Sequence, residues 1–191
     1  MRRIAILVAS TALMLALPAQ GGATTINFDD IPGGPGQRAV AGNRYAGLGV
    51  NMSSTGDLFA FDSATTNTPP VLIYGSSGFF ADSTVEFDFS SDLSFVSLAI
   101  YDIAIVPEAN WNLSVYDASN NLLQSITNNV DNVIYSFAVP GIRRLVFTPS
   151  SDAEGVDTLT FEATAVPEPA SLLLLGTGLL GGLRTLRKRV R

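Results

Sequence analysis

The segment from residue 24 to residue 165 has a pattern in which hydrophobic and polar positions alternate in short runs, separated by Gly, Pro, Asn, Asp and Ser. A period of two predicts β-strands that bury one face, and no run keeps the 3.6-residue period of an amphipathic helix. The expected strands are Thr24–Phe28, Gly47–Ser53, Asp57–Phe61, Val71–Tyr74, Ser83–Phe89, Ser94–Tyr101, Trp111–Tyr116, Leu122–Thr127, Val133–Phe137, Arg143–Phe147 and Asp157–Ala163. Short strands at this spacing favour an all-β fold, a two-sheet antiparallel β-sandwich in which alternate side chains face a shared core.

Turn-forming residues predict two of the connections in this segment. Ser54, Thr55 and Gly56 separate the second and third expected strands, so we expect these two strands to pair with each other. Pro and Gly make up residues 32–36, and this composition predicts a loop after the first strand.

Alternation also assigns side chains to faces of the strands. Two rows are expected to point into the core, namely Val85, Phe87 and Phe89, and Trp111, Leu113 and Val115. Trp111 is the only tryptophan, and stacking on a sugar is the alternative to its place in the core row. The alternation favours the core for Trp111. Tyr101 and Tyr116, at strand ends, are the other aromatic candidates for contact with carbohydrate.

The first 23 residues have a different pattern. Two arginines precede an uncharged apolar run over residues 4–17, and small residues then lead to Ala23. A basic start, an apolar run and a small-residue exit are typical of a secretory signal peptide. We therefore interpret residues 1–23 as a signal peptide that signal peptidase removes after Ala23, with Ala19 as the alternative position. The mature protein is expected to act outside the cytoplasm.

Residues 166–191 combine three features in a fixed order. Pro167, Glu168 and Pro169 come first, an uncharged Leu- and Gly-rich run fills residues 170–183, and a basic cluster ends the chain. This basic cluster consists of Arg184, Arg187, Lys188, Arg189 and Arg191. A helix over the apolar run is about 21 Å long against about 30 Å of hydrocarbon, which predicts a short, weak transmembrane anchor. The basic cluster should stay on the cytoplasmic side and leave the body outside.

This ordered triple resembles the PEP-CTERM sorting signal of Gram-negative bacteria. The resemblance implies recognition by an exosortase, a membrane-embedded cysteine protease found alongside exopolysaccharide biosynthesis genes. It also implies transient anchoring in the inner membrane, removal of the tail near Pro167-Glu168-Pro169, and delivery to the cell surface or extracellular matrix. A plain tail anchor with an accidental Pro-Glu-Pro sequence is the alternative.

Composition excludes several classes of chemistry. The chain has no Cys and no His, which removes zinc fingers, thiol nucleophiles, iron–sulfur clusters and Ser-His-Asp triads. Residues 24–165 hold four Arg, no Lys and 16 Asp or Glu, a net charge of −12. A body this acidic repels phosphate backbones, so we expect no nucleic-acid partner. Hard-oxygen metal sites and carboxylate chemistry remain available.

The body shows a second, looser resemblance. Its motifs are similar to the jelly-roll sandwiches common in PEP-CTERM proteins and, in turn, to galactose-binding-like and carbohydrate-binding modules. The motifs are Ile26–Ile31, Tyr45–Val50, Val115–Asn120 and Gly155–Phe161. In that fold the first and last strands often meet around a structural calcium ion.

This resemblance suggests a calcium site in the present chain. Asp29 and Asp30 end the first expected strand, Asp157 begins the last, and Glu154 is a further ligand candidate. Carboxylates and the backbone carbonyls of the Gly-rich loop supply the oxygens that calcium prefers. The alternative is ordinary turn chemistry, in which Asp bonds its own backbone, and the absence of a dense D-x-D-x-D sequence favours it slightly.

The carboxylates do not predict an enzyme. A glycosidase needs two carboxylates that face each other across a substrate cleft, and the spacing of the Glu residues indicates no such pair. We therefore expect a noncatalytic exported protein of the cell surface or extracellular matrix, sorted by exosortase and associated with exopolysaccharide. A carbohydrate-binding module and a small polysaccharide hydrolase are the alternatives. Calcium is the only cofactor that the residues suggest.

Overall fold

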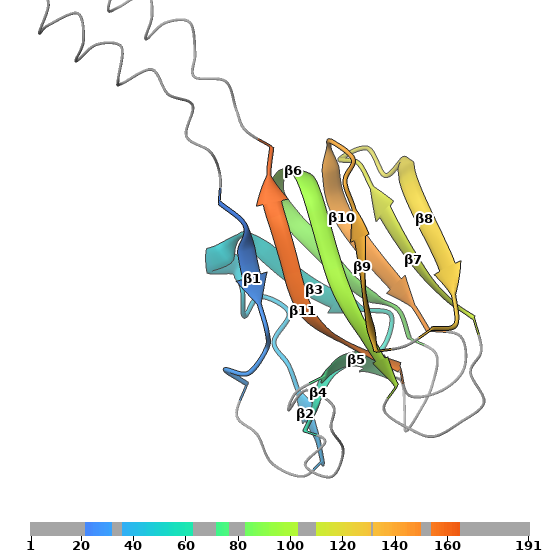
Figure 1. The fold of residues 1–191 in the computed structure, drawn as a ribbon. Helices are drawn as coiled ribbons and strands as arrows, with labels where there is room; N and C mark the ends of the chain where they lie inside the picture. The colour runs from blue at the N-terminus through green and yellow to red at the C-terminus, as the bar shows by residue number, and fades with distance from the viewer. Residues whose placement is uncertain are drawn as a thin grey trace, which may run out of the picture. The chain divides into compact units, whose positions relative to one another are not determined.

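The computed structural model describes residues 22–31, 36–62, 72–76, 83–102, 110–130, 132–149 and 154–164. Five predicted features lie outside this part of the chain: the signal peptide except Gly22 and Ala23, the loop over residues 32–35, the Pro167-Glu168-Pro169 motif, the transmembrane span and the basic cluster. Among the described residues, no helix is long and apolar enough to cross a membrane. They form eleven strands and one short 3-10 helix (Figure 1).

All the strand pairs are antiparallel, and the all-β prediction is confirmed. The 3-10 helix η1 (Ala46–Leu48) precedes β3 and ends at Gly49, whose φ of +84° suits glycine. The strands are β1 (Thr24–Ile26), β2 (Gly36–Ala39), β3 (Val50–Ser54), β4 (Asp57–Asp62), β5 (Leu72–Ser76), β6 (Val85–Asp102), β7 (Trp111–Tyr116), β8 (Leu122–Asn128), β9 (Val133–Phe137), β10 (Ile142–Thr148) and β11 (Glu154–Ala163).

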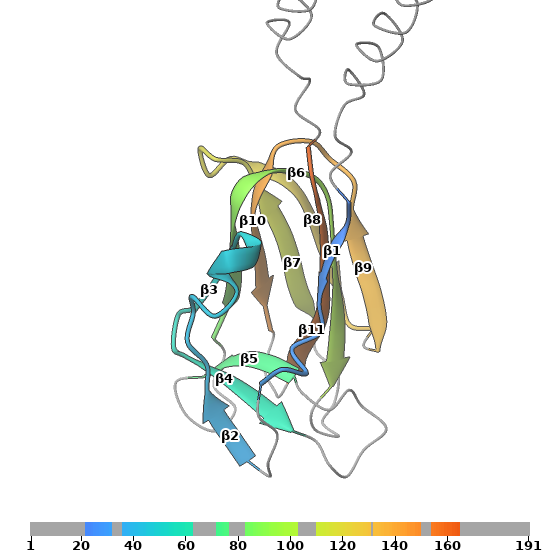
Figure 2. The same cartoon turned by 90° about the vertical axis from the view of Figure 1, so that its left-hand side faces the viewer.

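The long strand β6 belongs to both layers of the sandwich. Its first half, up to Phe89, pairs with β3 on one edge and β10 on the other, and β7 and β8 follow beyond β10. Its second half, from Leu93, pairs with β11 and β9. Figure 2 shows β6 arching from one layer to the other at the top of the body. The exposed residues 90–92 lie at this crossing.

The opposite edge of β11 carries β1 and β5, and β4 and β2 follow beyond β5. The first and last strands therefore pair, as the resemblance to jelly-roll sandwiches implied. Ile26 lies opposite Leu159, and the hydroxyl oxygens of Thr25 and Thr160 are 2.9 Å apart. This pairing places the residues that follow β1 beside the first half of β11.

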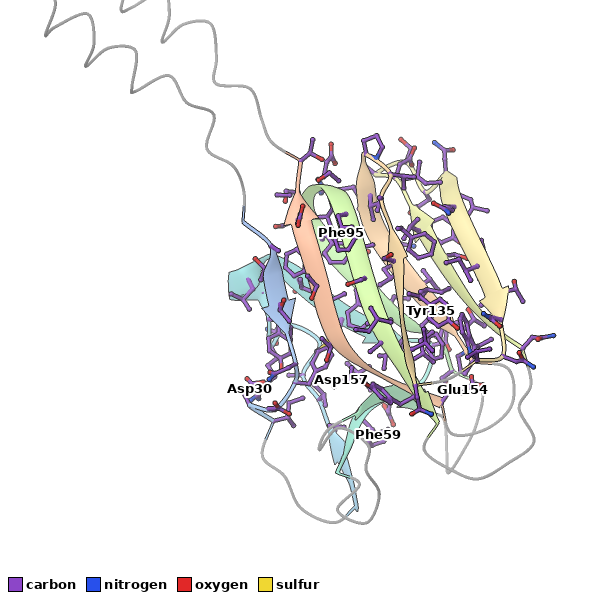
Figure 3. The ribbon with its side chains drawn as sticks, in the orientation of Figure 1. Asp30, Phe59, Phe95, Tyr135, Glu154 and Asp157 are labelled. Atoms are coloured by element: carbon purple, nitrogen blue, oxygen red, sulfur yellow. The ribbon has the colours of Figure 1, made fainter. Side chains whose placement is uncertain are left out.

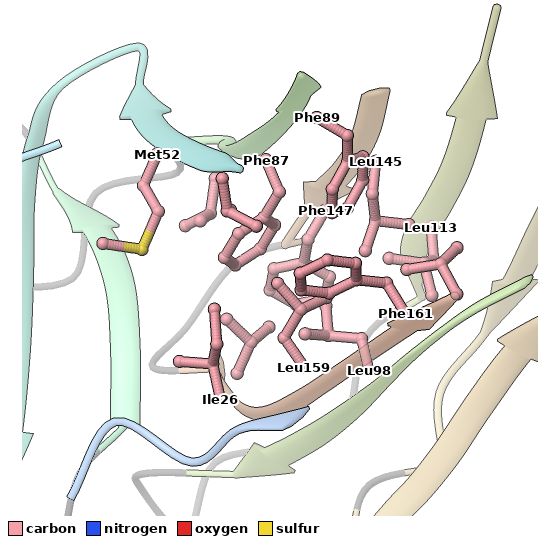
Figure 4. Close-up of a cluster of buried hydrophobic side chains, with 14 of the residues drawn as sticks. Ile26, Met52, Phe87, Phe89, Leu98, Leu113, Leu145, Phe147, Leu159 and Phe161 are labelled. Carbon is pink, nitrogen blue, oxygen red and sulfur yellow. The ribbon is translucent and has the colours of Figure 1, made fainter. Parts of the chain in front are cut away.

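The core lies between the two layers and is filled by the inward rows of the strands (Figure 4). Both rows predicted to face the core do so, and each member is less than 5% exposed: Val85, Phe87, Phe89, Trp111, Leu113 and Val115. Burial of each large apolar side chain stabilises the fold by about 1.5–3 kcal/mol relative to leaving it in water. The alternation of the sequence thus predicted the interior of the sandwich.

The predicted pairing of the second and third strands is wrong. The strand after η1, β3, pairs with β6, whereas β4 pairs with β2 and β5. The reason lies in the apolar row of β3, because Val50 lies opposite Phe89 and Met52 opposite Phe87. These cross-strand pairs extend the buried row of β6, which a hairpin with β4 would not do.

Two further differences concern strand boundaries. The segments predicted as Ser83–Phe89 and Ser94–Tyr101 form one continuous strand, β6, because the chain keeps its ladder while it bends between the layers. Strand β2 was not predicted, since Gly36–Ala39 has no alternation of apolar and polar residues. Its partner β4 supplies the pairing that forms it.

Candidate functional site

The junction between β1 and β11 contains two residues with an unusual backbone conformation. Phe28 has a φ of +57° and Thr158 a φ of +47°, which bulky and β-branched residues rarely adopt. Thr158 lies where the register between β11 and β6 shifts, between Asp157 and Thr160, so β11 has one extra residue there. Bulges of this kind re-aim side chains and occur often beside functional sites.

Asp157 is the buried carboxylate beside this bulge, with 4% of its surface exposed (Figure 3). Its Oδ2 accepts a hydrogen bond from the Thr158 hydroxyl at 3.1 Å, whereas its Oδ1 has no hydrogen-bond partner among the described residues. Burial raises the pKa of Asp157 to about 6, and the charge of Asp29 contributes to the increase. Because an unpaired buried charge is costly, this oxygen favours a proton or a bound cation.

Asp29 is the second member of the predicted calcium set that lies at this junction. It is exposed and accepts a hydrogen bond from Asn27 Nδ2 at 2.5 Å. Its negative charge contributes to the raised pKa of Asp157. A divalent cation near these two carboxylates would relieve their repulsion and supply a partner for the free oxygen of Asp157. The donor chemistry of this pair therefore fits calcium, with further oxygens required from the backbone or from water.

The third member, Asp30, belongs to a different network. The Nη2 of Arg44 lies 3.1 Å from Asp30 Oδ2, and the Tyr45 hydroxyl donates a hydrogen bond to Asp30 Oδ1 at 2.5 Å. The Tyr45 hydrogen bond and the charge of Arg44 hold the pKa of Asp30 below its ordinary value. In the described ranges, no three His, Cys, Asp or Glu residues could together hold a metal ion. Arg44 and Tyr45 thus engage Asp30, whereas the charge of Asp29 acts on Asp157.

Trp111 lies in the core and is 1% exposed. Its ring packs edge to face on Tyr135, with centroids 4.7 Å apart, and lies 6.3 Å from the ring of Phe147. This burial leaves no face of the indole open to a sugar, so Trp111 is removed from the carbohydrate candidates.

The other two aromatic candidates are half-buried and lie in different parts of the sandwich. Tyr101, in the second half of β6, is opposite Gly155 of β11, and burial followed by the charge of Asp157 raises the pKa of its hydroxyl. Tyr101 therefore belongs to the surroundings of Asp157, a relationship that the sequence did not indicate. Tyr116 lies at the end of β7, opposite Arg144 of β10.

A polar network on the outward side of β7 and β8 was missed in the sequence. Asn112 Nδ2 donates to the hydroxyls of Ser125 at 2.8 Å and Thr127 at 3.0 Å, and Ser114 donates to Asn112 Oδ1 at 2.6 Å. Alternation puts Asn112 and Ser114 on the face of β7 opposite the core row, where Asn112 is half-buried and Ser114 is 4% exposed. Their partners on β8 depend on the strand register, which the sequence pattern did not give.

Every arginine whose side chain the structure describes pairs with a carboxylate. The pairs are Arg44 with Asp30 at 3.1 Å, Arg143 with Asp92 at 3.5 Å, and Arg144 with Asp88 at 2.9 Å and Glu86 at 3.8 Å. The positive charges of this part of the body are therefore engaged within the chain, and the remaining surface charge is acidic.

The C-terminal residues match one protein-family model. The model describes the PEP-CTERM protein-sorting motif, and the match covers residues 165–189. The chain therefore carries this motif, with Pro167, Glu168 and Pro169 inside it, and such a motif indicates an exported protein sorted by exosortase. The matched residues lie outside the part of the chain that the structure describes.

Several solved structures show a distant likeness to the chain. The K2 cleaved adhesin domain of Lys-gingipain has a TM-score of 0.42 and 13% identity, and the match covers 73% of this chain and 99% of that one. A fucose-binding module of Streptococcus pneumoniae has a TM-score of 0.35 and 12% identity, with 80% and 98% covered. A family 32 carbohydrate-binding module from Clostridium perfringens has a TM-score of 0.38 and 5% identity, with 65% and 99% covered. No curated protein sequence matches the chain.

Proposed function

We propose that this chain is a noncatalytic protein of the cell surface or extracellular matrix, which exosortase releases from a transient anchor in the inner membrane and which associates with exopolysaccharide. The observation that carries the proposal is the PEP-CTERM motif over residues 165–189. It follows a body whose described part is nearly all β-strand. In this proposal the β-strand body is the part of the protein that remains at the cell surface or in the extracellular matrix after processing.

The processing part of the proposal has a physical order. Signal peptidase frees the N-terminus after Ala23, and the basic cluster holds the end of the tail on the cytoplasmic side. The short apolar run then leaves Pro167-Glu168-Pro169 near the outer surface of the membrane. Proline disfavours helix in the residue before it, which keeps this region extended for a protease. Cleavage there releases the body.

Intact-mass analysis of protein recovered from the surface of the native cell tests this processing. The expected mass corresponds to a chain that lacks both the signal peptide and the segment from about Ala170 onward. Glu168→Gln should leave the tail attached, whereas Glu162→Gln, the same change in β11, should not. Recovery of a full-length tail in a strain with active exosortase would leave only the permanent-anchor alternative.

Carbohydrate binding is the second candidate function, and the outward side of β7, β8 and β10 supports it. Tyr116 lies there beside Arg144, and the Asn112 network presents hydroxyl and amide groups of the kind that bind sugars. The test is co-sedimentation of the protein with the purified exopolysaccharide of the producing cell. Tyr116→Ala should reduce binding, and Leu48→Ala, an exposed change on η1, should not. Loss of polymer length during incubation would instead favour the hydrolase alternative.

The proposal also includes a structural calcium ion at the β1–β11 junction. Asp157 and Asp29 would hold it through carboxylate oxygens, and the ion would supply charge neutralisation rather than catalysis. The unpartnered Oδ1 of Asp157 is the observation that supports this assignment. Asp30 is not included, because Arg44 and Tyr45 engage both of its carboxylate oxygens.

A further inference from the structure

The segment of the chain from β8 to β9 carries five of the six exposed large hydrophobic residues in the described ranges. They are Leu122, Leu123, Val130, Val133 and Ile134, with exposed fractions from 37% to 60%, and the sixth is Leu48 on η1. Figure 1 shows β8 at an edge of the sandwich. Exposed apolar residues concentrated on an edge strand and on the segment that follows it indicate an interaction surface.

This segment is also without charge over a long stretch. No Asp, Glu, Lys or Arg occurs from residue 118 to residue 130, although residues 24–165 carry a net charge of −12. A second copy of the body is repelled by the acidic faces, and the three arginines whose side chains the structure describes, Arg44, Arg143 and Arg144, are engaged in ion pairs within their own chain. The neutral β8 side is where a second copy can approach with the least repulsion.

The backbone of β8 offers a specific mode of contact. Among the described strands, β8 pairs only with β7, so its other edge has backbone N–H and C=O groups without a strand partner. After a register shift at Leu123, the pairing is regular from Gln124 to Asn128. Natural edge strands are commonly protected by charged residues or proline, and β8 contains neither.

We propose that β8 pairs antiparallel with β8 of a second copy of this chain. A two-fold axis through the contact makes the same residues meet from both sides, so one sheet continues across the dimer. Leu122 and Leu123 are then shielded at the contact, with Val130, Val133 and Ile134 beside it. A cationic partner fits this side less well, because β8 itself carries no carboxylate that would attract it.

The test is sedimentation velocity of the full chain in a mild detergent over a wide range of concentrations. The expected result for the natural chain is a reversible dimer. Leu122→Glu should raise the dimer dissociation constant about ten-fold or more, because a carboxylate buried in an apolar contact is costly. The matched control is Leu48→Glu, since Leu48 is 52% exposed and Leu122 57%, and it should leave the dimer unchanged.

Three results would overturn the proposal: a monomer at every concentration, a dimer that Leu122→Glu leaves intact, or equal weakening by both variants. The circular dichroism spectrum of each variant shows that the fold is retained. Because the chain has no cysteine, Ser125→Cys and Thr127→Cys add a second readout. At least one of them should form a disulfide-linked dimer on oxidation, and Leu48→Cys should not. Equal cross-linking at Leu48 would show a nonspecific contact.

Discussion

Trp111 on β7 and Tyr135 on β9 meet edge to face, with their ring centroids 4.7 Å apart and their planes at 71°, so the two layers of the sandwich touch through this pair. The Tyr135 hydroxyl donates a hydrogen bond to the carbonyl of Val130 at 2.8 Å and accepts one from Asn128 Nδ2 at 3.1 Å. A single side chain therefore joins the core to the connection between β8 and β9.

Removal of the Tyr135 hydroxyl should destabilise the fold without emptying the core. Tyr135→Phe keeps the ring against Trp111 but loses two hydrogen bonds, so we expect the free energy of unfolding to fall by about 1–2 kcal/mol. Tyr135→Ala should cost about 3–5 kcal/mol, because it also leaves a cavity. Urea titration measures both. Tyr116→Phe, at a half-buried strand end, serves as the control and should change stability little.

The buried Asp157 predicts a pH dependence of stability. Its pKa is about 6 in the folded protein and near the ordinary 3.8 in the unfolded chain, so the folded state binds the proton more tightly. Its contribution to stability is therefore fully present below pH 3.8 and is lost as the pH rises through about 6. Asp157→Asn should remove this dependence and, without metal, be more stable than the natural chain at pH 7 by about 2–3 kcal/mol.

The measurement for Asp157 is chemical denaturation in chelator at a series of pH values between 3 and 8. The exposed Asp57 provides the matched control, since Asp57→Asn should follow the pH profile of the natural chain. Parallel profiles for Asp157→Asn and the natural chain would contradict the raised pKa.

Calcium should stabilise the body through Asp157 and Asp29. An ion present at about a hundred times its dissociation constant adds roughly 2.7 kcal/mol to the free energy of unfolding. The melting temperature with calcium should therefore exceed the melting temperature with chelator, and Asp157→Asn or Asp29→Asn should abolish the difference. Asp92→Asn should retain it. Equal melting temperatures for the natural chain under both conditions would exclude the calcium site.

The left-handed conformation of Thr158 predicts an unusual response to glycine. Glycine adopts a positive φ without the steric cost that a β-branched residue has, whereas glycine in a regular strand position weakens the strand. Thr158→Gly should therefore be more stable than Thr160→Gly by about 1–2 kcal/mol. Thermal unfolding of the two variants measures the difference. The opposite order would mean that the hydroxyl contact of Thr158 with Asp157 outweighs the backbone strain.

Residues 24–165 should fold without either end of the chain. The buried rows on either side of the core come from strands within this segment, so its expression alone should give a soluble protein with a β-rich circular dichroism spectrum. A helical or disordered spectrum would show that the predicted domain limits are wrong.

Local pattern predicted much of this fold. The bounds of β7 and β9 match the expected segments Trp111–Tyr116 and Val133–Phe137. The residues of β7 alternate between apolar and polar, and β9 is a short run rich in β-branched and aromatic residues that follows Asp131 and Asn132. The inward rows of β6 and β7 were also predicted, since alternation fixes which side chains share a face. The meeting of the first and last strands came from the resemblance to jelly-roll sandwiches rather than from the pattern.

Relationships between distant segments could not be predicted in the same way. Asp29 and Asp30 were predicted as ligands of the same calcium ion because they are adjacent in the sequence. In the structure they follow Phe28, which has a positive φ, and Arg44 and Tyr45 form hydrogen bonds with the carboxylate of Asp30. The pairing of β3 with β4 was predicted because the two strands are close in the sequence, but β3 pairs with β6. A three-residue connection indicates a hairpin only when both strands bury matching rows, and the row of β3 matches β6.

The antiparallel pairing of β1 with β11 has a mechanical consequence. Thr24 lies opposite Phe161, so the two ends of the body emerge at the same end of this strand pair. A force that pulls these ends apart acts across the ladder and opens its hydrogen bonds one after another. A different force acts when the chain is held at the C-terminal end of β11 and pulled by a ligand bound to another strand. This force acts along β11, so the hydrogen bonds of β11 with β6 and with β1 bear it at the same time, in shear. A protein held to a surface through its C-terminal side and pulled through its body thus resists in the stronger direction.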